Sequence, residues 1–255
     1  MVVAREHFFL DNQEDTIHSN QIELKTAKEK RANWWYYHKI QLGIIVVIVA
    51  IAVGIVYSVV SKVEPDYTIG LLTQDTYISD IVTRLEEELT EYADDRNGDG
   101  QVIVKIAQYA VGSTSTDPQI QQANTVRFMG DASNFDSVIY LCDSKSLEWA
   151  QTQAGGFFTY ADGTTPEEGA TDYENMKVDW EDCKGLMNMD LTMNVLTDKQ
   201  VLAYMGPLGL SIRSVEGTSF LNNEDDMEYY RDCQALAQRL IDGEKMENSE
   251  ETESK

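Results

Sequence analysis

The chain has 255 residues, of which 44 are acidic and 20 are basic, so its formal net charge at pH 7 is −24. A surface this acidic repels the phosphates of nucleic acids and of anionic lipids, and we expect no nucleic-acid partner. The three histidines, His7, His18 and His38, all precede the longest apolar run. Residues after that run therefore cannot form a histidine-activated nucleophile or a histidine-ligated zinc site.

That apolar run extends from Ile40 to Ser61, carries no charge and is rich in Ile, Val and Ala. As a helix it would be about 33 Å long, enough to cross a hydrocarbon core of roughly 30 Å. Four aromatic residues, Trp34 to Tyr37, stand before it, where amphipathic rings favour the headgroup layer. The run lacks the polar stripe of a core helix, so we predict a helix that spans the lipid bilayer.

Flanking charge predicts the orientation of this helix. Five basic residues lie between positions 25 and 39, whereas only Lys62 follows the run before Arg84. Positive charge resists translocation, so we expect a cytoplasmic N-terminus and an extracellular C-terminal part. The alternative is cleavage after insertion, although the leader and the apolar run are both longer than those of a typical signal peptide.

These features divide the chain into five parts, and the fourth is long enough to bury its own core. We predict a cytoplasmic N-terminal segment (1–39), a transmembrane helix (40–61), a connector (62–66), an extracytoplasmic α/β domain (67–242) and a disordered acidic tail (243–255).

The predicted domain begins with alternating strands and helices. Three apolar runs have the pattern of strands, at 67–73, 101–109 and 137–143. Helical spacing predicts a helix over 78–92, with its glutamates mostly on the solvent face. A second helix begins at Asp117 and Pro118, because aspartate caps free amide groups and proline suits the first helical position, and it extends to about Met129. This order predicts a three-layer α/β fold with a mostly parallel sheet.

The later part of the domain is less regular. We predict further strands at 200–206 and 210–215 after a middle region without clear periodicity. A last helix begins after Asn222 or Asn223 and ends at Gly243. Its apolar face is formed by Met227, Tyr230, Cys233, Ala237, Leu240 and Ile241.

Three cysteines, Cys142, Cys183 and Cys233, all follow the apolar run. No two of them have the close spacing of a metal or redox motif. One disulfide can form, and Cys183 with Cys233 is the pair that we consider. Cys142 ends a strand-like run, which is typical of a small buried apolar residue.

The stretch "DRNGDGQV" resembles the first half of a calcium-binding loop. Asp95, Asn97 and Asp99 have the spacing that presents oxygens to one Ca²⁺ ion, and Gly100 allows the sharp turn. The twelfth position of such a loop is normally glutamate, but here it is Ile106. The alternative, a helix-to-strand turn that uses Asn-Gly and Asp-Gly, is the interpretation that we favour.

Two other residues are candidates for ligand contact. Trp149 belongs to an aromatic group that could stack on a sugar, although such residues more often pack in a core. Arg213 could bind an anionic ligand, although an ion pair is the more common role of arginine in so acidic a domain.

The outer domain resembles one lobe of extracellular solute-binding proteins of the type 2 periplasmic-binding class. The resemblance rests on "YTIGLLT", "DDRNGDGQVIVKIAQY", "DPQIQQANTVRFMGDASNFDSVIYLCD" and "VLAYMGPLGLSIRS". It implies a ligand cleft at the strand ends, and it covers about half of the outer segment. The chain has room for roughly one such lobe, held by an N-terminal helix.

We therefore expect a non-catalytic binding or assembly protein of the cell envelope, with an envelope protein as a partner. The first alternative is a ligand-binding component that serves a transporter or sensor. A pocket at the strand carboxyl ends around Gln74, Asp143 and Arg213 would favour that alternative, and a flat apolar patch would favour assembly. A carboxylate-based hydrolase is the third hypothesis, since glycosidases need only two carboxyl groups.

Overall fold

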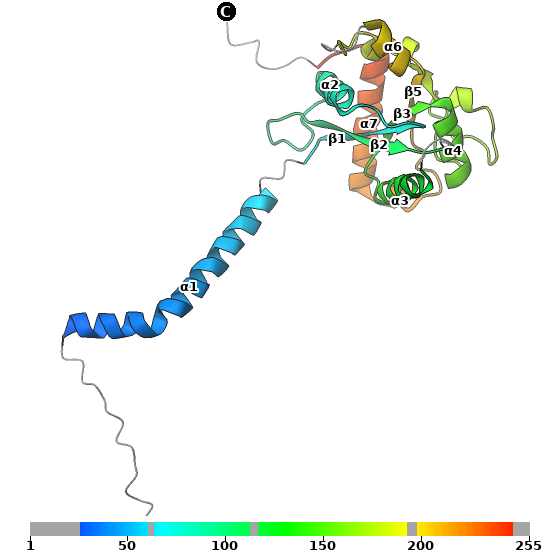
Figure 1. Cartoon of the computed structure of the whole chain (residues 1–255). Helices are drawn as coiled ribbons and strands as arrows, with labels where there is room; N and C mark the ends of the chain where they lie inside the picture. The colour runs from blue at the N-terminus through cyan, green and yellow to red at the C-terminus, as the bar shows by residue number, and fades with distance from the viewer. Residues whose placement is uncertain (1–25, 61–63, 113–116, 193–197, 247–255) are drawn as a thin grey trace, which may run out of the picture. The chain divides into compact units, whose positions relative to one another are not determined.

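The computed structural model describes residues 26–60, 64–112, 117–192 and 198–246 (Figure 1). The chain divides into two compact units, residues 1–63 and 64–255, each considered by itself. His7, His18, Ser61 at the end of the predicted span, residues 62–63 of the predicted connector and the tail beyond Met246 lie outside the described residues.

Helix α1 (Ala27–Val60) contains residues 40–60 of the predicted span and begins well before it. A capping box explains the early start: the Glu29 amide donates to Thr26 Oγ1 at 3.3 Å, and the Thr26 amide donates to Glu29 Oε2 at 3.2 Å. The large apolar side chains from Ile40 to Ile55 are exposed, apart from the half-buried Leu42, which is unlike the pattern of a core helix. By length and composition, α1 can cross a membrane.

The second unit contains a five-stranded sheet in the order β2-β1-β3-β5-β4. Strand β1 is parallel to both β2 and β3, whereas β5 is antiparallel to both β3 and β4. The unit is therefore α/β with a mixed sheet, and the prediction of a mostly parallel sheet is wrong. The strands are β1 (Tyr67–Thr73), β2 (Val104–Ala110), β3 (Ile139–Asp143), β4 (Val178–Asp179) and β5 (Leu208–Ile212).

The predicted helices of this unit are present, and their caps are those expected from the sequence. Asp117 Oδ1 accepts a hydrogen bond from the Gln119 amide at 2.8 Å, and Asn223 caps the last helix. The second predicted helix continues five residues beyond Met129, to Asn134. The helices are α2 (Ser79–Thr90), α3 (Pro118–Asn134), α4 (Ser144–Ala154), α5 (Lys184–Met187), α6 (Asp198–Met205) and α7 (Glu224–Asp242).

The predicted strand at 200–206 is wrong, because this segment forms most of α6. Val201 and Met205 are its buried residues, whereas Leu202 and Tyr204 are exposed. Burial of residues one helical turn apart, rather than alternate residues, is the pattern of a helix and not of a strand. The neighbouring prediction at 210–215 overlaps β5.

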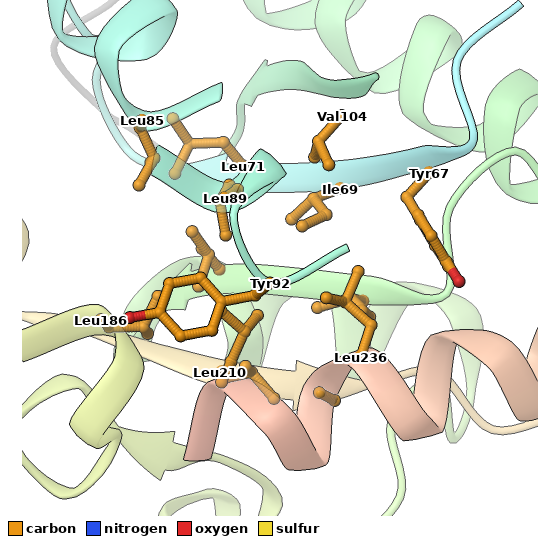
Figure 2. Close-up of a cluster of buried hydrophobic side chains, with 14 of the residues drawn as sticks. Tyr67, Ile69, Leu71, Leu85, Leu89, Tyr92, Val104, Leu186, Leu210 and Leu236 are labelled. Carbon is orange, nitrogen blue, oxygen red and sulfur yellow. The ribbon is translucent and has the colours of Figure 1, made fainter. Parts of the chain in front are cut away.

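Successive residues of the strands enter two apolar clusters, one on each face of the sheet. Tyr67, Ile69 and Leu71 of β1 pack with α2, α5 and α7, as Figure 2 shows. Leu72 belongs to the second cluster, which includes Phe128 of α3 and residues of α4. Helices therefore cover both faces of the sheet, which gives three layers.

The three cysteines are buried as free thiols, so the Cys183–Cys233 disulfide is not formed in this structure. Cys142 is fully buried in the second cluster, as predicted for a small apolar residue. Burial raises the pKa of Cys183 and of Cys233 to about 12, and it raises the pKa of Cys142 well above its usual value.

We expect maleimide to label these thiols very slowly at pH 7 in the folded protein, because the reactive species is the thiolate. After unfolding in denaturant, all three thiols should react, as counted by intact mass. A sample treated first with a reductant provides the control. A folded sample that exposes only one thiol on unfolding, and three after reduction, would show that a disulfide is present.

Candidate functional site

A cavity of about 510 Å³ lies at the carboxyl ends of β1 and β3. Strand β2 lies on one side of β1 and β3 lies on the other, so the strand order reverses at this point. In open α/β sheets, the crevice at such a reversal is the usual ligand site. The cavity is lined by Thr73, Gln74, Asp75, Thr76, Tyr77, Ile78, Ile81, Asp143, Ser144, Lys145, Tyr204 and Pro207.

The floor of this cavity is fixed by the carboxylate of Asp143, the last residue of β3 and the N-cap of α4. Its Oδ1 accepts hydrogen bonds from the amides of Lys145 (3.0 Å) and Ser146 (2.9 Å). Its Oδ2 accepts from the Gln74 amide (2.7 Å) and from Ser146 Oγ (3.1 Å). Because each oxygen has about two lone pairs, these hydrogen bonds occupy most of the acceptor positions of this carboxylate.

The same network reaches the third parallel strand. Ser146 Oγ also contacts the carbonyl oxygen of Val111 at 3.3 Å, just after β2. The Val111 amide donates to the carbonyl oxygen of Thr73 at 2.9 Å, and Gln74 Nε2 donates to that of Gly112 at 3.3 Å. The carboxyl ends of β1, β2 and β3 are thus joined by hydrogen bonds, which holds the cavity floor in one geometry.

Two tyrosines form the apolar wall of the cavity. Tyr77 precedes α2, and its hydroxyl donates to the carbonyl oxygen of Tyr204 at 2.6 Å. The two rings lie edge to face, with centroids 6.5 Å apart, and Tyr204 is 51% exposed. Burial, followed by the nearby charges of Asp143 and Asp75, raises the pKa of Tyr77 to about 12. At neutral pH the hydroxyl is therefore a donor, and it connects α6 to the loop after β1.

Two residues, Asp75 and Lys145, supply the charged groups of the cavity that could contact a ligand. Asp75 is exposed, and its carboxylate accepts no hydrogen bond from the described part of the chain. Lys145 is exposed at the start of α4, and it has no ion pair within the described residues. One carboxylate and one ammonium group, beside two aromatic rings, suit a small polar ligand with some apolar surface.

Trp149 does not line this cavity. It lies on α4 and packs in the second apolar cluster, with its ring centroid 5.7 Å from that of Phe128. A Cβ atom built on Gly112 would lie 3.4 Å from Trp149 Cβ, so the tryptophan also packs against the chain after β2. The observed contacts of Trp149 are those of a packing residue.

Arg213 lies at the opposite end of the sheet from Gln74 and Asp143. Strand β5 is antiparallel to β3, with Ile212 opposite Ile139, so its carboxyl end meets the amino end of β3. The structure therefore brings Gln74 and Asp143 together but separates Arg213 from them. A parallel strand at this position would have placed Arg213 near the cavity.

The guanidinium group of Arg213 is buried among aromatic rings. Its Cζ atom lies 5.0, 5.1 and 4.9 Å from the ring centroids of Phe135, Phe157 and Phe220. Its Nε and Nη1 atoms have no hydrogen-bond partner in the described part of the chain. Burial lowers the pKa of this group, yet arginine keeps its charge at physiological pH. Cation–π contacts replace the ion pair expected from the sequence.

The oxygens of the calcium-like loop accept hydrogen bonds from the loop itself. The Asp95 carboxylate accepts hydrogen bonds from the amides of Gly98 and Gly100. The side-chain oxygen of Asn97 accepts one from the Asp99 amide, and the Asp99 carboxylate accepts one from the Gln101 amide. Gly98 and Gly100 have φ values of 72° and 84°, the left-handed conformation that glycine favours. These bonds are those of a helix-to-strand turn, and no cluster of metal-ligating side chains occurs among the described residues.

The buried carboxylate of Asp66 attaches this turn to the sheet. It accepts hydrogen bonds from the amides of Arg96 (2.9 Å), Asn97 (3.0 Å) and Ile103 (2.8 Å). Asp66 is 1% exposed, just before β1. The turn is therefore held by the protein's own carboxylate, and Ca²⁺ binding here stays a prediction that this geometry does not require.

Sequence reasoning missed Tyr77, Lys145 and Tyr204 as cavity residues. Tyr77 and Lys145 follow closely after β1 and β3, and that position alone could have identified them. No comparable sequence position identified Tyr204 as a cavity residue, because its segment was expected to form a strand. Its place in the cavity depends on α6 being a helix.

Comparisons with protein-family models, with curated proteins and with solved structures found no match for this chain.

We expect Asp143→Ala to lower the free energy of unfolding by about 2 to 4 kcal/mol, because it removes a helix cap and unpairs the Gln74 amide. Asp75→Ala, at the same cavity but exposed, should change it by no more than about 0.5 kcal/mol. Asp143→Asn should retain part of the stability, because asparagine also caps helices. Thermal melting of the full chain in detergent would measure these values, and equal effects of the two alanine variants would contradict the role of Asp143.

Proposed function

We propose that this protein is a non-catalytic binding protein, anchored in the membrane by α1, whose second unit binds a small polar ligand outside the cell. The observation that carries the proposal is the cavity where the strand order reverses, with its fixed floor. This proposal favours the ligand-binding alternative, on a scaffold similar to one lobe of a solute-binding protein. Its partner would then be a transporter or sensor of the cell envelope.

The chemistry of the cavity supports a binding role. The floor is held by hydrogen bonds before any ligand arrives, which lowers the entropy cost of binding. Asp75 and Lys145 can meet opposite charges of a ligand, and Tyr77 and Tyr204 offer apolar contact. A zwitterionic or neutral polar molecule would suit this set of groups better than a strongly charged one.

A carboxylate-based hydrolase gains less support from the same groups. Such an enzyme needs two carboxyl groups that face the substrate. Asp143 uses both oxygens for internal hydrogen bonds, so among the described residues that line the cavity Asp75 is the carboxylate that is free to reach a ligand. The absence of histidine after residue 38 removes the most common general base.

The proposed orientation can be tested with protease added to intact cells. We expect the acidic C-terminal part to be digested and the segment before α1 to be protected, because the basic residues before the span resist translocation. An epitope tag at each terminus would report the two parts separately, and lysed cells would provide the control. Protection of the C-terminal tag in intact cells would contradict this orientation.

The proposed ligand binding can be tested by thermal melting of the full chain in nanodiscs with amino acids or monosaccharides, which are zwitterionic and neutral polar molecules. We expect one of these classes to raise the Tm, since a ligand at about 100 times its Kd stabilises the folded state by about 2.7 kcal/mol. Tyr204→Ala should remove this shift. Leu202→Ala, which changes an exposed neighbour outside the cavity, should retain it. Equal shifts in both variants would place the ligand elsewhere, and no shift with any class would contradict the proposal.

A further inference from the structure

Helix α3 has an unusually exposed outer face. Of its 17 residues, only Phe128 and Ala132 are buried. Ile120 and Val126, which are apolar, are 54% and 65% exposed. In Figure 1, α3 lies at the edge of the domain, with its inner side toward the sheet. We call the exposed face of residues 119–127 the α3 face.

The α3 face contains a shallow depression lined by Gln119, Gln122, Ala123, Val126 and Arg127. The first four of these residues follow the spacing i, i+3, i+4 and i+7. Four residues with this spacing form the hole that accepts a side chain from a second helix in knobs-into-holes packing. The depression exists because the side chain of Ala123 is small. Val126, on its rim, is an exposed apolar side chain.

The α3 face also differs from the rest of the domain in charge. Residues 118–130 contain no aspartate or glutamate, whereas 38 acidic residues occur after residue 39. Arg127 is the one basic residue of this segment. Its Nε atom lies 3.6 Å from Asp131 Oδ2, and its guanidinium group lies over the ring of Tyr109. Its charge is therefore balanced within the same chain. By contrast, α7 begins with three consecutive acidic residues.

We propose that the α3 face is a self-association surface that packs against the α3 face of a second copy of this chain. Two copies with a net charge of −24 repel each other through most of their surfaces, and this face allows contact without opposing carboxylates. The face offers both a hole at Ala123 and a projecting side chain at Val126, so it is complementary to itself, as a twofold interface requires.

A twofold axis near the depression would bring Ala123 close to Ala123 of the second copy. An antiparallel pair would also align the helix dipoles favourably, because the N-terminal end of each α3 would lie near the C-terminal end of the other. One helix pair is smaller than a standard interface of roughly 1,200–2,000 Å². We therefore expect a weak pair, and a covalent trap in the membrane is the appropriate measurement.

The test uses Ala123→Cys in the full chain, reconstituted in liposomes and oxidised with copper phenanthroline. The native thiols are buried, so the new cysteine is the exposed one among the described residues. The matched control is Ala235→Cys, an exposed alanine on the acidic helix α7. We expect Ala123→Cys to give about tenfold more disulfide-linked dimer than Ala235→Cys, because only the first pair would be held together.

Adding Val126→Glu to Ala123→Cys should lower the dimer yield by about tenfold, because two carboxylates would then face each other across the pair. Thr125→Glu, on the neighbouring part of α3 outside the depression, should lower it much less. Equal yields from Ala123→Cys and Ala235→Cys would overturn the proposal. So would crosslinking of Ala123→Cys to a different protein in host membranes without any dimer of this chain.

Discussion

The carboxylate of Asp143 is the group on which the geometry of the cavity depends. Its four hydrogen bonds cap α4 and attach the loop after β1, and Ser146 extends the network to the chain after β2. Hydrogen bonds to a charged carboxylate stabilise the folded state more than hydrogen bonds between neutral groups do. Removing this carboxylate would therefore leave several hydrogen-bond donors without a partner. Because both of its oxygens accept internal hydrogen bonds, Asp143 is a positioning residue, and contact with the proposed ligand would fall to its neighbours.

Binding rather than chemistry is consistent with how the other charged groups are used. Asp66 holds a turn, Arg213 is held among three aromatic rings, and the loop carboxylates accept bonds from their own backbone. Asp75 and Lys145 are the charged cavity residues without such internal partners in the described part of the chain. The proposed cavity and the proposed α3 face use different residues, so a ligand and a second copy could be bound together.

Several elements were predictable from local chemistry. The boundaries of β1, the caps Asp117 and Asn223 and the end of the last helix at Gly243 all follow from short-range patterns. Gln74 and Asp143 could be paired in advance because both follow apolar strands that are neighbours in a parallel arrangement. The α6 segment was not predictable in this way, because its apolar residues suit a strand until the burial of Val201 and Met205 is known.

The sequence by itself determined the apolar α1 segment, the acidic charge of the part after it and the alternation of strands and helices, because each depends on composition or on neighbours along the chain. Tertiary structure decided the direction of β5, and with it the separation of Arg213 from Gln74 and Asp143. It also decided that the three thiols are free and that Tyr204 faces the cavity. These features depend on which distant segments pack together, and periodicity along a single chain does not contain that information.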